Sequence, residues 1–273
     1  MQNTKPKHMA SVSGGKCSVA MVLKMLENNM EIDELVYFNS GWEFPIMIKQ
    51  AKKLAKKTGL KLTFLKPDPS FEDILFRLPI KRKIGPDKGK IYRHGHGWPV
   101  HNRRWNDRET VNVINRYCGH SIQYIGYPFE RKHKQKGQKN RSGATIFDGA
   151  FDKKKSYEEV QDLTQKKNTR YPLIEFGMDG NDCLRYCNQH GFDWVDFYEG
   201  RDRAGMYCCP LQPMSAIRLL RKQYPGLWEY MIWCDQQIEP NFGFNHGKTI
   251  VELEKQFQKE EEKQKQLEES SLL

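Results

Sequence analysis

An alternation of short apolar runs and amphipathic segments near the start of the chain places the strongest constraint on its fold. Apolar-leaning runs at residues 8–12, 34–38 and 60–65 predict strands. The segments between them, 17–28 and 45–58, carry apolar residues at helical spacing, with Pro45 at a helix start and Gly59 at a helix end. Strands that alternate with helices pair in parallel through right-handed crossovers, so we predict an α/β fold on a parallel sheet.

The rest of the chain predicts one further strand and several helices. The predicted elements are a strand at 121–126, a short apolar segment at 170–175, and helices at 108–117, 179–190, 215–223, 225–236 and 251–267. Asp179 is the N-cap candidate of its helix and Gly191 ends it; Cys183 and Cys187 are assigned to its apolar face. Residues 132–168 are rich in lysine and poor in apolar side chains, which indicates a mobile loop or lid.

The net positive charge and the cysteine content indicate which partners and which cell compartment to expect. The formal net charge of +11 favours polyanionic partners such as nucleotides or nucleic acid, although a solvated lysine-rich surface explains it equally well. Seven cysteines without an export signal indicate reduced thiols and a cytoplasmic location. No apolar run approaches the length of a membrane span, so we expect no membrane partner.

The segment ASVSGGKCSVAM, residues 10–21, joins the first predicted strand to the first predicted helix. Glycines in such a turn let backbone N–H groups converge on an anion, and the helix N-terminus adds partial positive charge. Lys16 adds a full charge, and serines add hydroxyl donors. The spacing fits neither G-x-x-x-x-G-K-[ST] nor G-x-G-x-x-G, and an ordinary glycine-rich bend is the alternative.

This loop resembles the PP-loop, S-G-G-x-D-S, of the adenine nucleotide alpha-hydrolase-like proteins, which include ATP pyrophosphatases and the 3'-phosphoadenylyl-sulfate (PAPS) reductase family. Five further segments resemble the PAPS reductase-like branch in the same order: FNSGWEFP, RYPLIEFG, CNQHGFDW, MYCCPLQ and VELEKQF. The resemblance covers nearly the whole chain apart from the lysine-rich insert. It implies a doubly wound, mostly parallel sheet with a C-terminal helical part, and an adenine nucleotide at the carboxyl ends of the strands.

The resemblance also implies the site residues. Those implied to bind the nucleotide are Ser11, Ser13, Gly14, Gly15, Lys16, Cys17, Ser18 and Gly41. Lys16, Glu43 and Arg131 are implied to be catalytic, with Lys16 and Arg131 stabilising charge on a departing pyrophosphate. Glu43 has an alternative role as a helix-start carboxylate that serves only the helix dipole. ATP with Mg²⁺ is the expected ligand.

Several positions depart from the family pattern. Cys17 stands where the family has Asp, and Asn39 and Ser40 replace an Asp-Thr pair. Because hard cations prefer oxygen ligands, these changes leave competence for ATP cleavage open. Cys17 at a helix N-terminus is a candidate reactive thiol, with a small packing residue as the alternative.

The resemblance implies four cysteine positions that together could hold an iron–sulfur cluster, and Arg103 and Met206 occupy two of them here. The candidates that remain are Cys208 and Cys209, and two thiolates do not complete a tetrahedral site. The histidines at 94, 96 and 101 are alternative ligands, and ordinary loop residues otherwise.

Basic segments supply a second functional signal. IKRK, NRRW and RKHKQKGQKNR cluster positive charge, with Trp98 and Trp105 interleaved, a combination that suits single-stranded nucleic acid. A flexible cover over an anionic nucleotide, or a solvated surface, is the alternative.

Three functions follow as hypotheses. The first is a PP-loop enzyme of the transferase class that cleaves ATP to AMP and pyrophosphate and activates a substrate for sulfur transfer, with a sulfur donor protein as partner. The second is a catalytically degenerate nucleotide- or nucleic-acid-binding module. The third is a thiol-dependent sulfonucleotide reductase. The resemblance implies that such a reductase uses a cysteine in its C-terminal tail, and this sequence has no cysteine after Cys234.

Four segments are expected along the chain. They are a nucleotide-binding core at 1–130, a basic flexible insert at 131–169, the C-terminal part of the PAPS reductase-like domain at 170–247, and a charged helix at 248–273.

Overall fold

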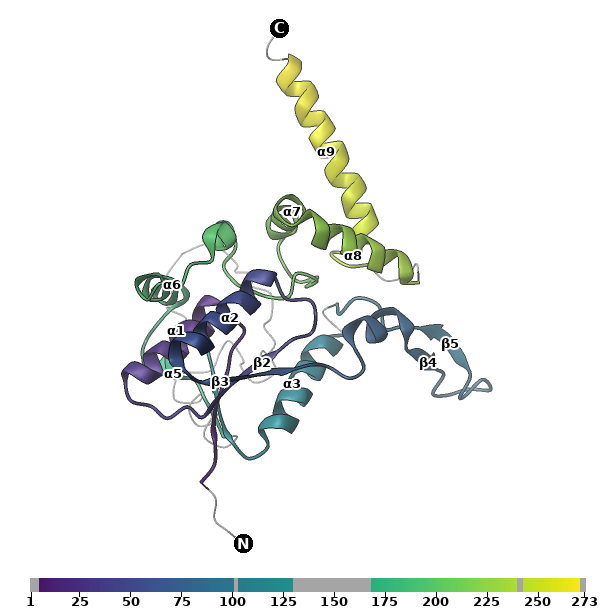
Figure 1. Cartoon of the computed structure of the whole chain (residues 1–273). Coiled ribbons are helices and arrows are strands. Elements are labelled where there is room, and N and C mark those ends of the chain that lie inside the picture. The colour runs from purple at the N-terminus through teal and green to yellow at the C-terminus, as the bar shows by residue number, and fades with distance from the viewer. Residues whose placement is uncertain (1–4, 101–102, 130–167, 240–242, 271–273) are drawn as a thin grey trace, which may run out of the picture. The chain divides into compact units, whose positions relative to one another are not determined.

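The computed structural model describes residues 5–100, 103–129, 168–239 and 243–270. The chain divides into two units, which we call the sheet unit (Met1–Pro67 with Asp107–Met206) and the helical unit (Asp68–Asn106 with Tyr207–Leu273) (Figure 1). The four segments expected from the sequence stay a prediction. The predicted insert and lid fall almost wholly on residues 130–167, outside the described residues.

The sheet unit is built on five parallel strands in the order β3-β2-β1-β6-β7. The strands are β1 (His8–Ser11), β2 (Glu34–Phe38), β3 (Lys61–Leu65), β6 (Ile122–Ile125) and β7 (Thr169–Arg170). β1 is central, and the chain adds strands first on its β2 side and then on its β6 side. The predicted doubly wound parallel sheet is confirmed, and its order reverses between β1 and β6, where such folds bind ligands.

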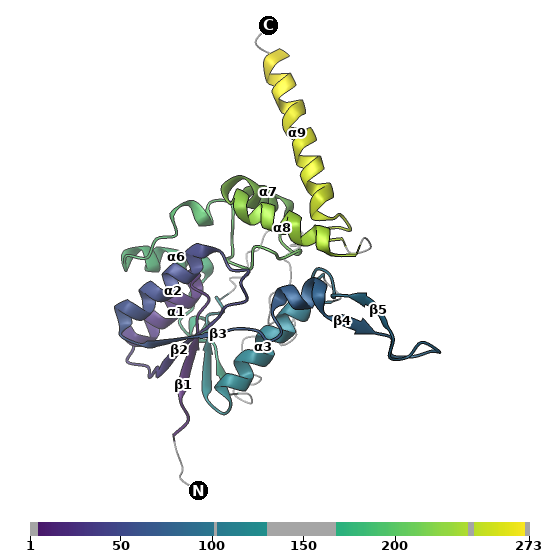
Figure 2. The same cartoon turned by 45° about the vertical axis from the view of Figure 1, so that its right-hand side comes forward.

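Helices cover both faces of this sheet. They are α1 (Lys16–Glu27), α2 (Pro45–Thr58), α3 (Trp105–Cys118), α5 (Pro172–Glu175), α6 (Gly180–Gln189) and the short 3₁₀ helix η2 (Val195–Tyr198). Met9 and Val36 point to one face and pack with Cys118 and Ile114 of α3. On the other face lie α1 and α2, with α6 packed against α1 (Figure 2). The core is therefore a helix–sheet–helix sandwich, as alternating strands and helices require.

Helix boundaries follow their local signals. The carboxylate of Asp179 accepts hydrogen bonds from the backbone N–H groups of Asn181 and Asp182 at 2.9 and 2.8 Å, and the Asp182 carboxylate accepts one from the Asp179 N–H at 3.1 Å. This capping box confirms the predicted N-cap of α6. The C-terminus of α2 is set by Gly59, which ends the helix with a left-handed φ of 71°.

The helical unit contains the C-terminal helices α7 (Met214–Gln223), α8 (Pro225–Gln237) and α9 (Ile250–Ser270), the π-helix η1 (Asp73–Arg77), and a hairpin of β4 (Pro79–Lys81) and β5 (Ile91–His94). The indole of the buried Trp98 donates to Asp235 of α8 at 2.8 Å, and the same carboxylate accepts from the Val251 N–H of α9 at 3.1 Å. Arg221 of α7 forms a two-bond pair with Glu254 of α9. Buried and partly buried polar bonds therefore join the helices of this unit.

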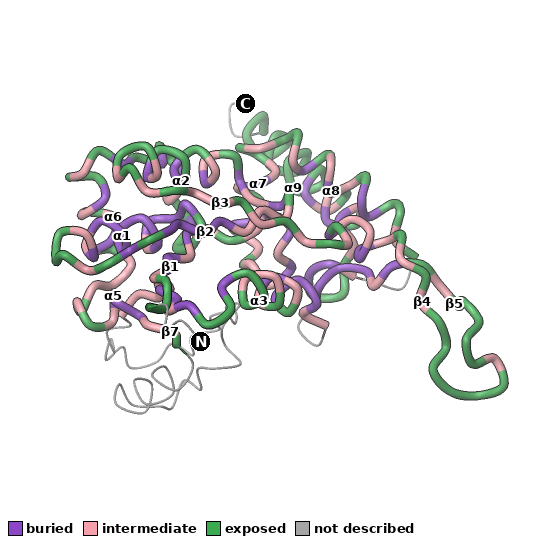
Figure 3. The backbone as a smooth tube through the Cα atoms, turned by 60° about the horizontal axis from the view of Figure 1, so that its bottom comes forward, coloured by how far each residue is buried: buried purple, intermediate pink, exposed green. Residues whose placement is uncertain are grey.

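The β4–β5 hairpin was not predicted, because its short strands lack the apolar alternation that marks a half-buried strand. Figure 3 shows the hairpin as mostly exposed backbone. Within the described residues, no helix combines the length and the apolar character that a membrane span requires.

Candidate functional site

Close backbone approach defines the loop between β1 and α1. Gly14 has φ +72°, and a Cβ at this position would lie 1.9 Å from the carbonyl oxygen of Met47. Gly126, directly after β6, lies against the first turn of α1, where its Cβ would be 2.8 Å from the Cα of Ser18. Glycine is thus required on both sides of the point where the strand order reverses, which is where a phosphate would need the backbone to come near.

Serine side chains hold the loop in shape. Ser18, which is buried, donates to the Gly15 carbonyl at 3.0 Å and accepts from the Ser13 N–H at 3.2 Å. The exposed Ser13 hydroxyl lies 3.3 Å from that of Ser18. Gly15 caps α1 without a side-chain bond. The first N–H groups of a helix lack helical partners, so the N-terminus of α1 has the character of an anion site.

Lys16 is covered by an aromatic ring. The residue is only 7% exposed, and its Nζ lies 4.5 Å from the ring centroid of Tyr198. The Lys16 N–H donates to the Tyr198 hydroxyl at 2.8 Å. Burial raises the pKa of Tyr198, so the ring stays a neutral phenol. The Tyr198 oxygen therefore accepts a hydrogen bond from the Lys16 N–H, a donor that would otherwise be available to an anionic ligand.

A second aromatic side chain from the same segment supports the loop. The indole of Trp194, which is buried, donates to the Gly14 carbonyl at 2.9 Å. Sequence reasoning missed both contacts. Trp194 lay in a quoted family segment, but nothing in the sequence linked Tyr198 to the loop.

Cys17 is the second residue of α1, the helix against which α6 packs with its buried Cys183 and Cys187. A hydrogen bond from the Cys183 thiol lowers the pKa of Cys17, and the charges of Lys16 and Arg203 lower it further, against the effect of burial. The Cys187 thiol donates to the Lys16 carbonyl at 3.3 Å. Both α6 cysteines are fully buried, whereas Cys17 is partly exposed. The cysteine at the unusual loop position is therefore the most accessible of these three cysteines.

Glu43 and Gly41 lie in the turn after β2. The Glu43 carboxylate accepts from the Ser40 hydroxyl at 2.6 Å and from the Gly41 N–H at 3.1 Å. Burial raises the pKa of Glu43. Gly41 is exposed with φ +88°, and no atom lies within 4 Å of where its Cβ would be. Glu43 thus orders its own turn, while a catalytic role for it and a binding role for Gly41 stay predictions.

The other predicted site residues are placed as follows. Ser11 is the last residue of β1, paired in register with Val36 and Ile125. Arg131 lies outside the described residues. Cys208 is buried and Cys209 partly exposed in the helical unit.

The donor set does not fit a protein-held metal. Nowhere in the described ranges do three or more His, Cys, Asp or Glu side chains gather in a way that could hold an ion. Cys17 offers a soft thiol where Mg²⁺ would need an oxygen. We therefore assign no chemical step to Mg²⁺ or to an iron–sulfur cluster.

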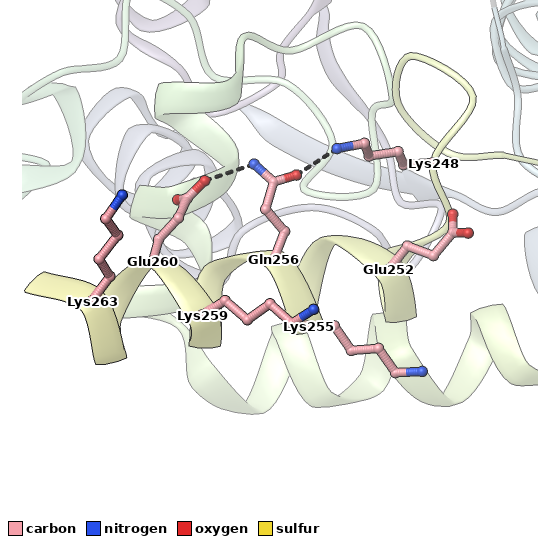
Figure 4. A pocket seen from close by; sticks show the side chains of 7 residues that line it. All are labelled: Lys248, Glu252, Lys255, Gln256, Lys259, Glu260 and Lys263. Carbon is pink, nitrogen blue, oxygen red and sulfur yellow. Dashed lines mark hydrogen bonds between the residues drawn. The ribbon is translucent and has the colours of Figure 1, made fainter.

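A hollow along α9 is unsuited to catalysis. Figure 4 shows its lining of alternating lysine, glutamate and glutamine side chains, in which Gln256 bridges Lys248 and Glu260 through bonds of 2.7 Å. Charged and amide side chains in hydrogen bonds along an exposed helix face are typical of a solvated surface. The loop at the end of β1 remains the candidate site.

One family model matches the N-terminal part of the chain, and two further comparisons found similar proteins. Residues 7–83 match the model of the phosphoadenosine phosphosulfate reductase domain. An uncharacterized protein of Methanocaldococcus jannaschii is 23% identical over 243 residues, covering 88% of this chain and 49% of that protein, so the chain spans about half the length of that relative. Among solved structures, the U34-tRNA thiolase NcsA from Methanococcus maripaludis, solved with its [4Fe-4S] cluster, is similar with a TM-score of 0.40 and 14% identity, over 82% of this chain and 69% of that one.

Proposed function

We propose that this PAPS reductase-like chain binds an adenine nucleotide at the loop between β1 and α1 and cleaves ATP to AMP and pyrophosphate, activating a substrate for sulfur transfer. The observation that carries the proposal is the glycine-lined approach of β1 and β6 to the N-terminus of α1, beside the side chain of Lys16. Convergent backbone donors, a helix N-terminus and an ammonium group together suit the phosphates of a nucleotide.

The residues of the loop have different roles in this proposal. Ser13 and Ser18 shape the loop, and the N–H groups of the first turn of α1 face the phosphates. Attack of a substrate oxygen on the α-phosphorus breaks its bond to the bridging oxygen, and negative charge builds on the departing pyrophosphate. Lys16 stabilises that charge once its ammonium leaves the Tyr198 ring, and Arg131 is proposed to assist. A sulfur donor protein would act after this activation.

Cys17→Asp tests whether the loop is catalytically intact. The substitution restores the family's carboxylate, so we expect pyrophosphate release from Mg-ATP to rise about fivefold, or roughly 1 kcal/mol in barrier. The measurement is pyrophosphate formed with time under reducing conditions. Cys17→Asn is the matched control, since it has the same size without the charge, and it should not exceed the wild type. Absence of pyrophosphate from both the wild type and Cys17→Asp would instead support a binding module without turnover.

The β4–β5 hairpin favours nucleic acid as the substrate class. Residues 79–94 contain six lysines and arginines and one aspartate, Asp87, which pairs with Lys90 at 2.8 Å. Tyr92 is 46% exposed, and the guanidinium groups of Arg82 and Arg93 lie 5.4 and 5.3 Å from its ring centroid. An exposed ring flanked by arginines can stack on a base while the arginines contact phosphates.

Tyr92→Ala is expected to weaken binding of a fluorescent single-stranded RNA about fivefold, since stacking on one base contributes roughly 1 kcal/mol or more. Fluorescence anisotropy at several salt concentrations measures the affinity. Arg82→Gln should also reduce the slope of log affinity against log salt by about 0.7. Lys263→Gln on α9, an exposed lysine far along the chain, is the control and should change the affinity little. Equal RNA affinities for Tyr92→Ala and the wild type would show that the Tyr92 ring of the hairpin does not bind RNA.

A further inference from the structure

The segment 194–204, which we call the strap, lies against the loop between β1 and α1. At one end of the strap, the indole of the buried Trp194 donates to the Gly14 carbonyl at 2.9 Å. At the other end, the Cβ of Ala204 lies 3.1 Å from the position that a Cβ on Gly15 would take. Both ends of the strap therefore contact the loop, and strap and loop belong to the same sheet unit.

Between these two ends, Tyr198 occupies the donors of the first turn of α1. Its hydroxyl oxygen accepts from the Lys16 N–H at 2.8 Å, a distance at which a phosphate oxygen would accept the same bond. Its ring centroid lies 4.5 Å from the Lys16 ammonium nitrogen. One side chain thus contacts both the backbone donor and the positive charge that an anion would use.

We propose that the strap is autoinhibitory: Tyr198 covers the anion-binding groups of Lys16, and a phosphate group must displace Tyr198 in order to bind. The inference rests on the anion site of the proposed function, but it does not depend on ATP cleavage. The phenol of Tyr198 is a neutral acceptor, whereas a phosphate oxygen is charged and forms hydrogen bonds about twice as strong. Phosphate is therefore the better partner for Lys16 once the strap has opened.

The backbone of the strap provides two positions at which it can pivot. Val195 has φ +52°, a left-handed conformation that strains a β-branched residue, and it is 71% exposed. Gly200 has φ +73° and adopts this conformation without strain. Tyr198 lies between these two positions, so it can move while Trp194 and Ala204 stay on the loop. Movement of Tyr198 away from Lys16 would also let Val195 relax.

Aromatic packing holds the strap closed. Phe197 is buried, and its ring meets that of Phe44 edge-on, with 4.9 Å between the centroids. The ring of Tyr198 packs edge-on against that of Phe197 at 5.2 Å. Opening the strap loses part of this packing, so the closed form is the resting state of the free protein. An anion that binds only the open form has an affinity reduced by the fraction of protein that is open.

Tyr198→Phe tests the proposal, with inorganic pyrophosphate as the probe. The substitution keeps the ring and removes the oxygen that accepts from the Lys16 N–H, so the closed form loses one hydrogen bond. We expect pyrophosphate to bind about fivefold more tightly to this variant than to the wild type. Isothermal titration calorimetry on the full chain measures both affinities.

Tyr186→Phe is the matched control. The Tyr186 ring also lies near a lysine of α1, at 5.4 Å from Nζ of Lys24, but its hydroxyl donates to Glu27 at 2.8 Å and not to the loop. This variant should bind pyrophosphate as the wild type does. Equal or weaker binding by Tyr198→Phe, the same gain in both variants, or no binding to wild type and Tyr198→Phe alike would overturn the proposal.

ATP, titrated in parallel, separates this inference from the proposed function. If pyrophosphate binds more tightly to Tyr198→Phe while ATP binds neither protein, the autoinhibitory contact stands and the nucleotide site does not. If ATP and pyrophosphate each bind the wild type and Tyr198→Phe with equal affinity, the nucleotide site stands and the autoinhibitory contact does not.

Hydrogen exchange of the wild-type chain decides the question even where a variant folds poorly. The single turn of η2 is too short to persist without packing. We therefore expect the amides of residues 195–201 to exchange about threefold faster when pyrophosphate is bound, because the strap is then open. Slower exchange would show that the strap closes over the anion instead, and slower or unchanged exchange would overturn the proposal.

Discussion

Replacing Gly14 with alanine is expected to destabilise the sheet unit by about 2–5 kcal/mol, the sum of a left-handed backbone penalty and the strain of overpacking. Gly14 has φ +72°, and its Cβ would lie 1.9 Å from the Met47 carbonyl oxygen. That atom belongs to the backbone of α2 and cannot rotate away. Either the loop or the start of α2 must move, so the same change should also abolish the anion cradle. Urea unfolding followed by circular dichroism measures the loss.

Gly59→Ala is the matched control for this prediction. Gly59 has a nearly identical φ of +71°, but no atom lies within 4 Å of its Cβ position. It therefore carries only the backbone penalty, about 1–2 kcal/mol. Equal losses in the two variants would show that the close approach of Gly14 to Met47 contributes nothing.

Lys16→Ala is expected to weaken ATP binding about 30-fold, or roughly 2 kcal/mol. A charge-assisted bond from an ammonium to a phosphate contributes up to about 3 kcal/mol. Against this, the wild-type ammonium must leave the Tyr198 ring at 4.5 Å, a contact that costs about 1 kcal/mol to lose. The phosphate contact is the larger effect, so a net loss remains. Isothermal titration calorimetry with ATP measures it.

Lys24→Ala controls for the loss of a lysine from the same helix. Lys24 also lies over a tyrosine ring, that of Tyr186 at 5.4 Å, and pairs with Glu27 at 2.9 Å. It stands two turns beyond the loop, so its removal should leave the ATP affinity unchanged. A similar loss of ATP affinity in both variants would show that Lys16 acts only through the overall charge of the protein.

Local signals made most of the fold predictable. Pro45 and Gly59 bound α2 at the predicted residues, and Asp179 forms the predicted cap of α6. β2 was predicted with its observed bounds because residues 35–38 are a continuous apolar run directly after Glu34, as is typical of buried parallel strands. These elements carry start and stop signals within a few residues of themselves.

What the sequence could not predict depends on long-range contacts. Tyr198 and Lys16 are 182 positions apart, and no local pattern links them. Cys183 and Cys187 were assigned correctly to a buried helix face, but that assignment did not show that the Cys187 thiol donates to the Lys16 carbonyl, 171 positions away. The resemblance proposed a glycine loop, and only the packing of Gly14 and Gly126 showed how close the backbones come.

The most direct test of nucleotide binding at this loop is the thermal unfolding midpoint of the reduced wild-type chain, measured alone, with Mg-ATP and with PAPS. We expect ATP at about 100 times its dissociation constant to add roughly 2.7 kcal/mol of stability and to raise the midpoint clearly, and we expect Lys16→Ala to lose most of this shift. A shift with PAPS alone would favour a sulfonucleotide reductase over the proposed function. No shift with either nucleotide would contradict the central claim.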